Sequence, residues 1–376
     1  FPHPGHNMRV RTVGVEEEFL LFDAEHDRLM DIGPDVADAA ERNADDSNAD
    51  DSKADGQFEK ELKQAQAEHA SSPATSLAEL ATELTAQRGQ LVEAARRRGA
   101  RLIASGSSPV GDESATTDDG RYHHMERRFA ALQQGELTCA MHVHVSVDSD
   151  DEAVAVLNRI APWLSVLAAL TANSPFHDGR DTGYASYRRI VWNQWPTAGP
   201  TNSFADPAAY RRLVQDLIDT GAARDQGMIY FDARLSADYP TVELRVCDVC
   251  IDVEDAVTVA GLCRALVQTA AAGEGCLRLP AELLRAASWR AARFGMTGDL
   301  VDLTRAAGSS TLAPAWDLVD ALADHVRTAL DEAGDTDRVR RGLQRIKDTG
   351  SGAERQRSAA DGTGLSGAIA ATTVKV

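Results

Sequence analysis

Three short segments of the chain alternate polar and apolar residues with a period of two: VGVEEEF at 13–19, MHVHV at 141–145 and VELRVCD at 242–248. Successive side chains of a β-strand point to opposite faces of the sheet, so each segment predicts a strand with one polar and one apolar face. The predicted strands come in hairpin-like groups between helices, not as a series of parallel βαβ units. The chain therefore predicts an α+β fold whose mainly antiparallel sheet has an apolar back covered by helices and a polar front.

The first of these segments crowds three carboxylates into an otherwise apolar strand. Glu16 and Glu18 share one face, about 7 Å apart, and Glu17 points the other way. Burying carboxylates side by side is costly unless they are paired or bind a cation. Two carboxylates on one face are the minimum for holding a hard divalent cation such as Mg²⁺. We expect Glu17 to pair with a basic residue or to reach solvent, and to be the most replaceable of the three.

The other two segments add polar pairs to the same predicted front face. His142 shares a face with His144, and Glu243 shares a face with Arg245. Taken alone, an H-x-H pattern is more often a solvated sheet face, and an E-x-R pattern is often a cross-strand salt bridge. Three same-face polar pairs on three predicted strands are hard to explain as independent surface residues, and together they favour a concave functional site.

A fourth acidic segment, residues 57–71, contributes Glu59, Glu61 and Glu68. Its composition favours a helix, and its alternation allows a strand. As a strand it would place Glu59 and Glu61 on one face and Glu68 on the other, whereas as a helix it would align Glu61 with Glu68 two turns apart. The pattern leaves both arrangements open.

Helix and loop signals place these strands in one domain, residues 8–376. Residues 76–100 predict an amphipathic helix that begins after Ser76, with Glu79 three residues later as a capping box. The aromatic and Pro/Gly-rich stretch 184–204 is typical of an active-site loop.

Three segments are expected to lie outside the packed domain. The acidic stretch 43–56 predicts a mobile loop, because its Asp, Asn and Ser residues cannot bury apolar surface. The Gly- and Ser-containing end, 347–376, predicts a flexible tail. Residues 1–7 precede Met8 and are interpreted as an added remnant or an extended start.

Composition narrows the class of protein further. The formal net charge of −19 argues against a nucleic-acid partner. Five cysteines without small-domain spacing indicate reduced thiols in a cytoplasmic protein, and the C-x-x-C of Cys247 and Cys250, with no second pair, reads as ordinary core or strand residues. No signal peptide is recognisable, and no run approaches eighteen uninterrupted apolar residues, so we expect no membrane span.

Several of these motifs together resemble one family. The stretches VGVEEEFLLFD, EKELKQAQAE, MHVHVSV, YRRIVWNQWPTAGPT, VELRVCDV and RAARFG are similar to those of the ATP-dependent carboxylate–amine ligases of the glutamate–cysteine ligase type 2 family, collinear from about Val10 to about Arg357. The resemblance implies a glutamine-synthetase-like catalytic domain, a curved antiparallel sheet with helices on its outer face. It implies ATP and Mg²⁺, with Mn²⁺ as a substitute, and it is compatible with a homodimer.

The resemblance also implies a reaction and a set of site residues. A carboxylate, typically the γ-carboxylate of glutamate, is activated as an acyl phosphate, and an amine such as cysteine attacks it. The implied metal ligands are Glu16, Glu18, Glu61, Glu68, His142 and Glu243. The implied nucleotide- or phosphate-binding residues are Arg245, His144, Arg188, Arg189 and Arg293. Catalytic roles are assigned to Arg245, Glu243 and Asp248, the last of which would orient Arg245 or accept a proton from the amine.

Two departures from the family pattern bear on substrate recognition. Arg189 stands where a small polar residue is expected, and the end LSGAIAATTVKV lacks the expected aromatic and acidic residues.

Two other functions remain open. One is a metal-dependent hydrolase that binds Zn²⁺ or Mn²⁺ through His142, His144 and the acids. The other is a non-catalytic sensor of a nucleotide or an amino acid on the same fold.

Overall fold

The centre of the molecule is a seven-stranded sheet in which every strand pair is antiparallel. The computed structural model describes residues 10–47, 58–59, 61–304 and 311–375 of the 376-residue chain. The strand order is β2-β3-β1-β5-β9-β8, with β4 pairing with β1. The strands are β1 (Val13–Asp23), β2 (Phe58–Glu59), β3 (Gln66–Ala70), β4 (Ala100–Ile103), β5 (Ala140–Ser146), β8 (Ala233–Leu235) and β9 (Thr241–Asp248). This confirms the predicted antiparallel sheet, and β8 and β9 form a hairpin within it.

The apolar face of the sheet is covered by helices. Val13, Val143 and Leu244, one from each of the three alternating strands, are fully buried in one core with residues of these helices. Ser76 caps the covering helix α2, and Glu79 completes the predicted capping box. A short 3₁₀ turn that contains Pro162 separates α5 from α6. The covering helices are α2 (Leu77–Arg96), α5 (Asp150–Ile160), α6 (Leu164–Leu170) and α9 (Val253–Ala272).

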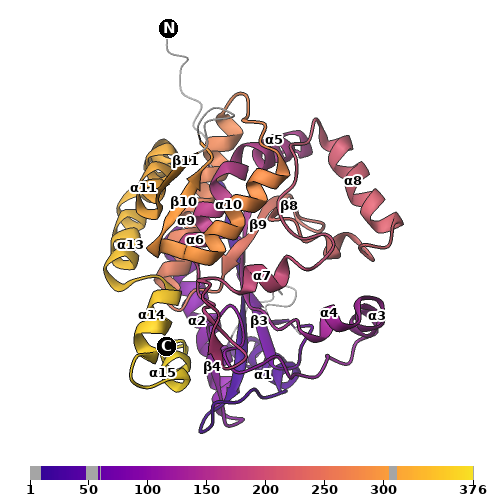
Figure 1. Cartoon of the computed structure of the whole chain (residues 1–376), viewed down its shortest axis with the longest axis vertical. Coiled ribbons are helices and arrows are strands. Elements are labelled where there is room, and N and C mark those ends of the chain that lie inside the picture. Colours follow the sequence, from indigo (N-terminus) through magenta and orange to yellow (C-terminus); the bar gives the residue numbers. More distant parts are fainter. Residues whose placement is uncertain (1–9, 48–57, 60, 305–310, 376) are drawn as a thin grey trace.

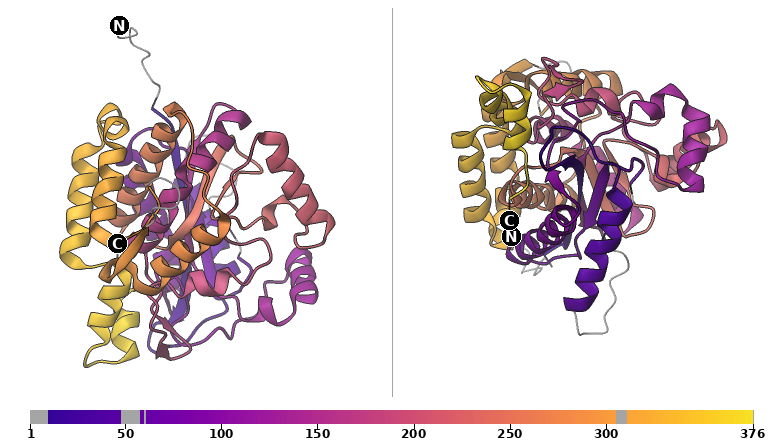
Figure 2. Two further views of the ribbon diagram at one scale, coloured as in Figure 1. Left: turned by 45° about the horizontal axis from the view of Figure 1, so that its top comes forward. Right: turned by 90° about the horizontal axis from the view of Figure 1, so that it is seen from below.

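Shorter elements lie around the sheet and its covering helices: α3 and α7 line the polar face, α8 packs against α5, and α10 packs against α6. Figures 1 and 2 show α3, α4 and α8 projecting on the side away from the C-terminal helices. The predicted loop at 184–204 contains one short helix, α7. The two small hairpins are β6–β7 and β10–β11. These elements are α3 (Gly120–Phe129), α4 (Ala131–Gln134), β6 (Phe176–His177), β7 (Arg180–Asp181), α7 (Arg188–Trp192), α8 (Pro207–Asp219), α10 (Ala281–Phe294), β10 (Asp299–Asp302) and β11 (Thr311–Pro314).

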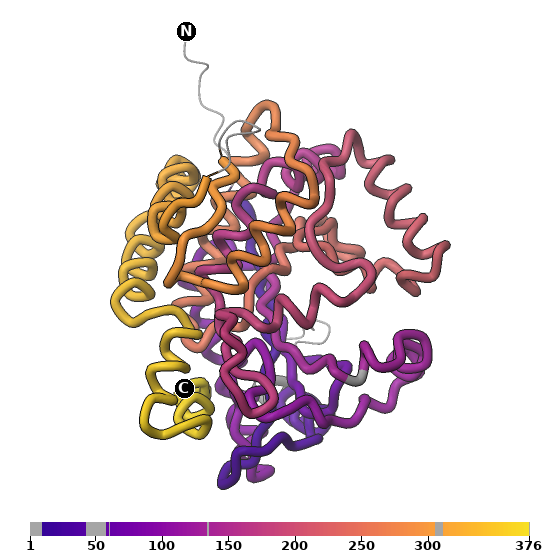
Figure 3. The backbone as a smooth tube through the Cα atoms, in the orientation of Figure 1, coloured from indigo at the N-terminus to yellow at the C-terminus, as the bar shows by residue number. Residues whose placement is uncertain are grey.

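The end of the chain is not the flexible tail that its composition predicts. Figure 3 shows it folded back against the N-terminal half, where Ile369 is buried beside β1 and β4. The buried Gln356 donates to the backbone and side-chain oxygens of Asn173 at 2.9 and 2.8 Å, and Gly352 packs so closely on Asn173 that a Cβ would overlap it. The C-terminal helices are α11 (Ala315–His325), α12 (Arg327–Ala333), α13 (Thr336–Thr349), α14 (Gly352–Ala360) and α15 (Leu365–Ala371).

The acidic stretch predicted as a loop at 43–56 is helical at its start, because α1 extends over Gly33–Ser47. The rest of that stretch and residues 1–8 lie outside the described residues. Cys247 and Cys250 are buried free thiols, as expected for core residues.

One helical stretch, Asp150–Leu170, is long and apolar enough to cross a membrane by length and composition. It comprises α5, the 3₁₀ turn and α6, and 78% of its most apolar window is buried inside the protein. Core helices of globular proteins pass the same test, so this stretch is explained by its place in the core.

Candidate active site

An open cavity of about 290 Å³ lies over the polar face of the sheet. Its walls come from β1, β2, β3, β5 and β9 on one side and from α3, α7 and the segments around them on the other. Its carboxylates are Glu16, Glu18, Glu59, Glu61, Glu68 and Glu136. Its other polar and aromatic residues include Arg121, Tyr122, His142, Trp192, Trp195, Tyr230, Arg234 and Arg245.

The alternation of β1 divides its three glutamates as the sequence predicts. Glu16 and Glu18 line the cavity, whereas Glu17 faces the helices and is fully buried. Across the sheet, Glu16 is paired in register with His142 of β5, and Glu18 with Glu68 of β3. Antiparallel register therefore collects acids and an imidazole from three strands on one face.

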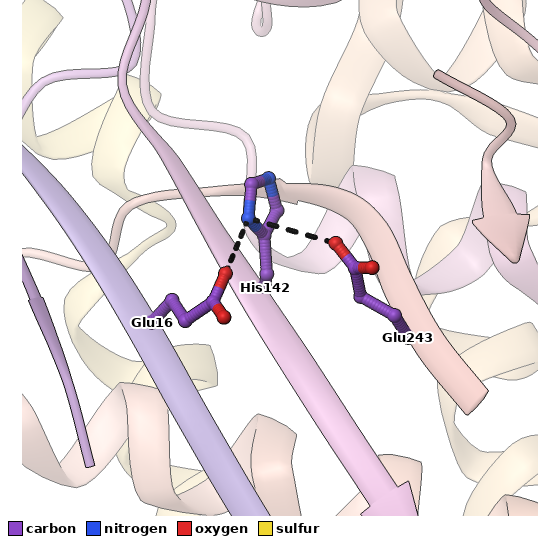
Figure 4. Close-up of side chains that lie close together, drawn as sticks. All are labelled: Glu16, His142 and Glu243. Carbon is purple, nitrogen blue, oxygen red and sulfur yellow. Dashed lines mark hydrogen bonds and ion pairs between the residues drawn. The ribbon is translucent and has the colours of Figure 1, made fainter. Parts of the chain in front are cut away.

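Two overlapping groups of side chains have the geometry of cation sites. Glu16, His142 and Glu243 form one, and Glu18, Glu68 and His142 form the other, with the potential ligand atoms of each group within 4.8 Å of one another. Figure 4 shows Glu16 and Glu243 pointing from their strands toward His142, whose Nδ1 lies 3.1 and 4.0 Å from their carboxylate oxygens.

The second group is rich in uncompensated negative charge. Burial, with the nearby Glu61 carboxylate, raises the pKa of Glu18 to about 8. Burial and the same neighbour raise the pKa of Glu68 well above its usual range. A divalent cation would relieve this repulsion, and oxygen-rich donor sets suit Mg²⁺ and Mn²⁺. The residues present therefore fit such a cation.

In the first group, histidine and arginine partly compensate the negative charge of the glutamates. Burial opposes ionisation of Glu16, but His142 and His144 outweigh it and lower its pKa well below the usual value. Burial and Arg245 lower the pKa of His142 to about 4, so its imidazole is neutral near pH 7, the form that ligates metals. His144 contacts Thr241 through Nδ1 at 3.0 Å and Glu16 through Nε2 at 3.0 Å, so it orients Glu16 and is absent from both cation groups.

Arginines meet the acids at the β8–β9 side of the cavity. Arg245 contacts Glu243, as their shared face predicts, and its guanidinium lies 5.9 and 6.0 Å from the ring centres of Trp192 and Tyr230. Arg234 binds the same Glu243 with N–O distances of 2.5 and 3.2 Å. Burial opposes ionisation of Glu243, but Arg245 and Arg234 lower its pKa to about 2. Sequence reasoning did not identify Arg234 as a site residue. The signal that could have found it is its position opposite Glu243 in the β8–β9 pair.

The predicted site residues Asp248 and Arg188 lie apart from the cavity. Both side chains are buried and absent from the cavity lining. Asp248 accepts hydrogen bonds from Ser174, Ser186 and Arg188 at 2.7, 2.8 and 3.0 Å. Arg188 also donates to the carbonyl oxygens of Arg245 and Cys247 at 3.0 and 2.6 Å. The pair therefore fixes β9 to α7 from behind, since its hydrogen-bonding capacity is used within the protein.

Arg189 and Arg293 are also misplaced by the sequence-based assignment. Arg189 is buried, with Nη2 at 2.5 Å from Asp232 and 2.9 Å from Ser288. Arg293 donates to the carbonyl oxygen of Gly183 and lies over the ring of Tyr184. Neither lines the cavity. Arg189 lies in the segment 184–204, of which only the tryptophans enter the site, and Arg293 lies in α10.

The acids of 57–71 reach the cavity by a route that neither alternative anticipates. The segment forms β2 and β3 with a turn between them, so Glu59 pairs with Glu68 across the two strands. Glu59, Glu61 and Glu68 all line the cavity. The extended alternative placed Glu68 on the other face from Glu59 and Glu61, whereas all three acids line the cavity because the turn resets the alternation.

The comparisons with known proteins agree on one family. Residues 12–372 match the family model described as glutamate-cysteine ligase family 2. A Frankia alni protein named "Putative glutamate--cysteine ligase 2-2" is 47% identical over 93% of this chain and 92% of its own length. A Salinispora arenicola protein named "Putative glutamate--cysteine ligase 2" is 44% identical over 95% and 92%.

Solved structures show the same fold at low sequence identity. A glutamate–cysteine ligase from Francisella tularensis, solved in complex with AMP, superposes with a TM-score of 0.68 at 12% identity, covering 96% of this chain and 87% of its own. A bifunctional glutathione synthetase from Pasteurella multocida gives 0.66 at 12% identity, covering 97% and 52%. These likenesses confirm the predicted fold class.

Proposed function

The chain belongs to glutamate–cysteine ligase family 2 and is a carboxylate–amine ligase of that type, and on this premise we propose that it uses ATP and Mg²⁺ to join the γ-carboxylate of glutamate, or of a similar acid, to an amine. The observation that carries the proposal is the pair of buried carboxylates Glu18 and Glu68, whose pKa values are raised beside a neutral His142. These acids face the open cavity, where a divalent cation would relieve their repulsion.

The residues that would hold the cations are those on the front of the sheet. They are Glu16, Glu18, Glu61, Glu68, His142 and Glu243. Bound there, Mg²⁺ would neutralise phosphate oxygens of ATP and so make the γ-phosphorus open to attack. An acid-lined cavity and an anionic nucleotide are compatible only through such cations. The AMP in the Francisella tularensis enzyme supports nucleotide use at this fold.

The proposed reaction has two balanced steps. A carboxylate oxygen of the acid attacks the γ-phosphorus of ATP, and the bond from that phosphorus to the β-phosphate oxygen breaks. The products of this step are ADP and an acyl phosphate. The amine nitrogen then attacks the acyl carbon, the C–O bond to phosphate breaks, and the nitrogen loses one proton. Arg245 and Arg234, which line the cavity, would bind the negative oxygens that develop in both steps. The nearby Trp192 and Tyr230 rings shield the guanidinium group of Arg245 from water.

The hydrolase alternative loses support from the placement of the histidines. A zinc site built on the H-x-H pattern needs both imidazoles as ligands. His144 instead binds Thr241 and Glu16, and it belongs to neither of the cation groups found among the described residues.

The test is a coupled assay for ADP and phosphate release. The protein is mixed with ATP, Mg²⁺, glutamate and a panel of amines that includes cysteine, and then with other acids in place of glutamate. We expect release that needs acid, amine and Mg²⁺ together. ATP binding by calorimetry without release for any pair would instead support the sensor function.

A further inference from the structure

Two carboxylates of the cavity, Glu59 and Glu136, are left unused by the proposed cation sites, and of these Glu136 is the buried one. It lies between α4 and β5, lines the cavity, and belongs to neither group of potential metal ligands among the described residues. Its side chain is 3% exposed. Buried carboxylates are normally paired with a cation or bind a metal, so this one needs a partner.

The protein holds this carboxylate with two neutral donors. Thr138 Oγ1 donates to one oxygen at 2.6 Å, and the indole Nε1 of Trp195 donates to the other at 2.9 Å. No lysine, arginine or histidine among the described residues forms an ion pair with it. Burial raises the pKa of Glu136 in spite of these bonds. The nearby charges of Arg188 and Lys63 lower the pKa without outweighing burial. The group is therefore fixed in position by neutral donors.

Aromatic rings form the wall beside it. Trp195 contacts Tyr230 and Phe129 with ring centres 5.6 and 5.0 Å apart, and Tyr230 in turn contacts Trp192 at 4.7 Å. A buried carboxylate next to aromatic faces is a common recognition site for an organic ammonium group.

We propose that Glu136 binds the α-ammonium group of the acid substrate, held in place by Thr138 and Trp195. This inference rests on the proposed ligase function, and it assigns the acid to the α-amino acids. The attacking amine is a poorer occupant, because a buried carboxylate would hold that nitrogen protonated and so keep it from acting as a nucleophile. A non-reacting ammonium group has no such conflict.

The test pairs a variant with a truncated substrate. Glutarate is glutamate without its α-ammonium group, and Glu136→Gln removes the partner charge while keeping the shape. We expect the wild type to prefer glutamate over glutarate in kcat/KM, and Glu136→Gln to lower that preference about 10- to 100-fold, the range of a charged hydrogen bond. The KM for ATP should stay unchanged. Glu113→Gln, which neutralises an exposed carboxylate of a nearby loop, should leave the preference as it is.

A purely structural role for Glu136 predicts a different result. Loss of the contacts to Thr138 and Trp195 would lower activity equally with both acids, so an unchanged preference in a folded Glu136→Gln variant overturns the proposal. If that variant fails to fold, Trp195→Phe keeps the carboxylate and removes one of its donors. It should raise KM for glutamate and spare glutarate, and equal effects on the two acids would again overturn the proposal.

Failure of the ligase function would be visible separately. Thermal shift with glutamate and with glutarate, measured on the wild type and on Glu136→Gln, needs no turnover. Stabilisation of the wild type by glutamate alone, lost in the variant, would support the ammonium site even if no amine is joined. Equal stabilisation by the two acids, or by neither, would overturn it.

Discussion

Glu17 and Glu18 are neighbours in β1, yet they lie in opposite electrostatic environments. Glu17 faces the helices, where Arg88 of α2 binds it through two hydrogen bonds of 2.8 and 2.5 Å, and His69 lies 3.3 Å away. Burial opposes ionisation of Glu17, but Arg88 and His69 lower its pKa to about 2. Burial and Glu61 raise the pKa of Glu18 to about 8.

These two neighbouring residues therefore have different roles: Glu17 stabilises the fold, and Glu18 belongs to the proposed site. Arg88 also donates to the carbonyl oxygens of Ile251 and Cys250 at 2.8 and 3.0 Å, so the Glu17–Arg88 pair joins β1, α2 and the segment after β9. Its charges are satisfied by the protein. The charge of Glu18 is left to be satisfied by something that binds. A buried carboxylate with its own cation maintains the fold, and one without a cation marks the site.

The largest effect is expected for Glu18→Gln. We expect turnover to fall by at least about 100-fold, because a cation ligand and a transition-state charge interaction are lost together. The thermal midpoint should stay within a few degrees, since Gln resembles the protonated acid that the raised pKa favours near pH 7. ADP release and thermal denaturation measure the two. A variant with near-normal turnover would remove Glu18 from the site.

Glu17→Gln should show the reverse pattern. The substitution leaves the buried Arg88 without its anion, and breaking a buried pair costs about 3–5 kcal/mol of folding stability. Turnover at a temperature where the variant is folded should stay within about threefold of wild type. Urea denaturation measures the loss of stability. The paired change Glu17→Met with Arg88→Met is the control, because removing both charges should recover part of it.

This expectation revises what the sequence indicated about Glu17. Pairing with a basic residue was predicted and is confirmed. The prediction that it is the most replaceable of the three glutamates concerns activity, and it now stands beside a large expected cost in stability.

The same contrast predicts opposite pH windows. Glu18 must lose a proton before it binds a cation, so affinity for Mn²⁺ should rise with pH by up to about tenfold per unit and level off above about 8. Glu17 has a lowered pKa, so its contribution to stability is complete above the unfolded value of about 4.3 and is lost as pH falls toward 2. Calorimetric titration of Mn²⁺ and acid denaturation test the two. Mn²⁺ affinity that is flat from pH 6 to 8 would contradict the first.

The sequence predicted the front of the sheet well because strand alternation is a local property. Glu16, Glu18 and His142 needed only a period of two to be placed on one face, and Glu243 with Arg245 followed the same rule.

The errors arose where tertiary packing decides. Arg188 and Asp248 are charged residues close to motif positions, and nothing local shows that they bind each other behind the sheet. Glu136 is a lone acid before β5, and its place in the cavity depends on Trp195, 59 positions along the chain. The C-terminal residues have a composition typical of a flexible tail, and they are ordered by contacts such as Gln356 with Asn173, 183 positions apart.

The smallest effect is expected for Glu93→Gln, which tests whether environment or pairing makes Glu17 important. Glu93 also binds arginine, with Arg96 and Arg97 both at 2.8 Å, but all three side chains are well exposed on α2. Solvent screens such pairs, and water replaces the lost contact at little cost. We expect no measurable change in the thermal midpoint and none in turnover. A loss comparable to that of Glu17→Gln would mean that the ion pair itself, rather than its burial, carries the stability that we assign to the back of the sheet.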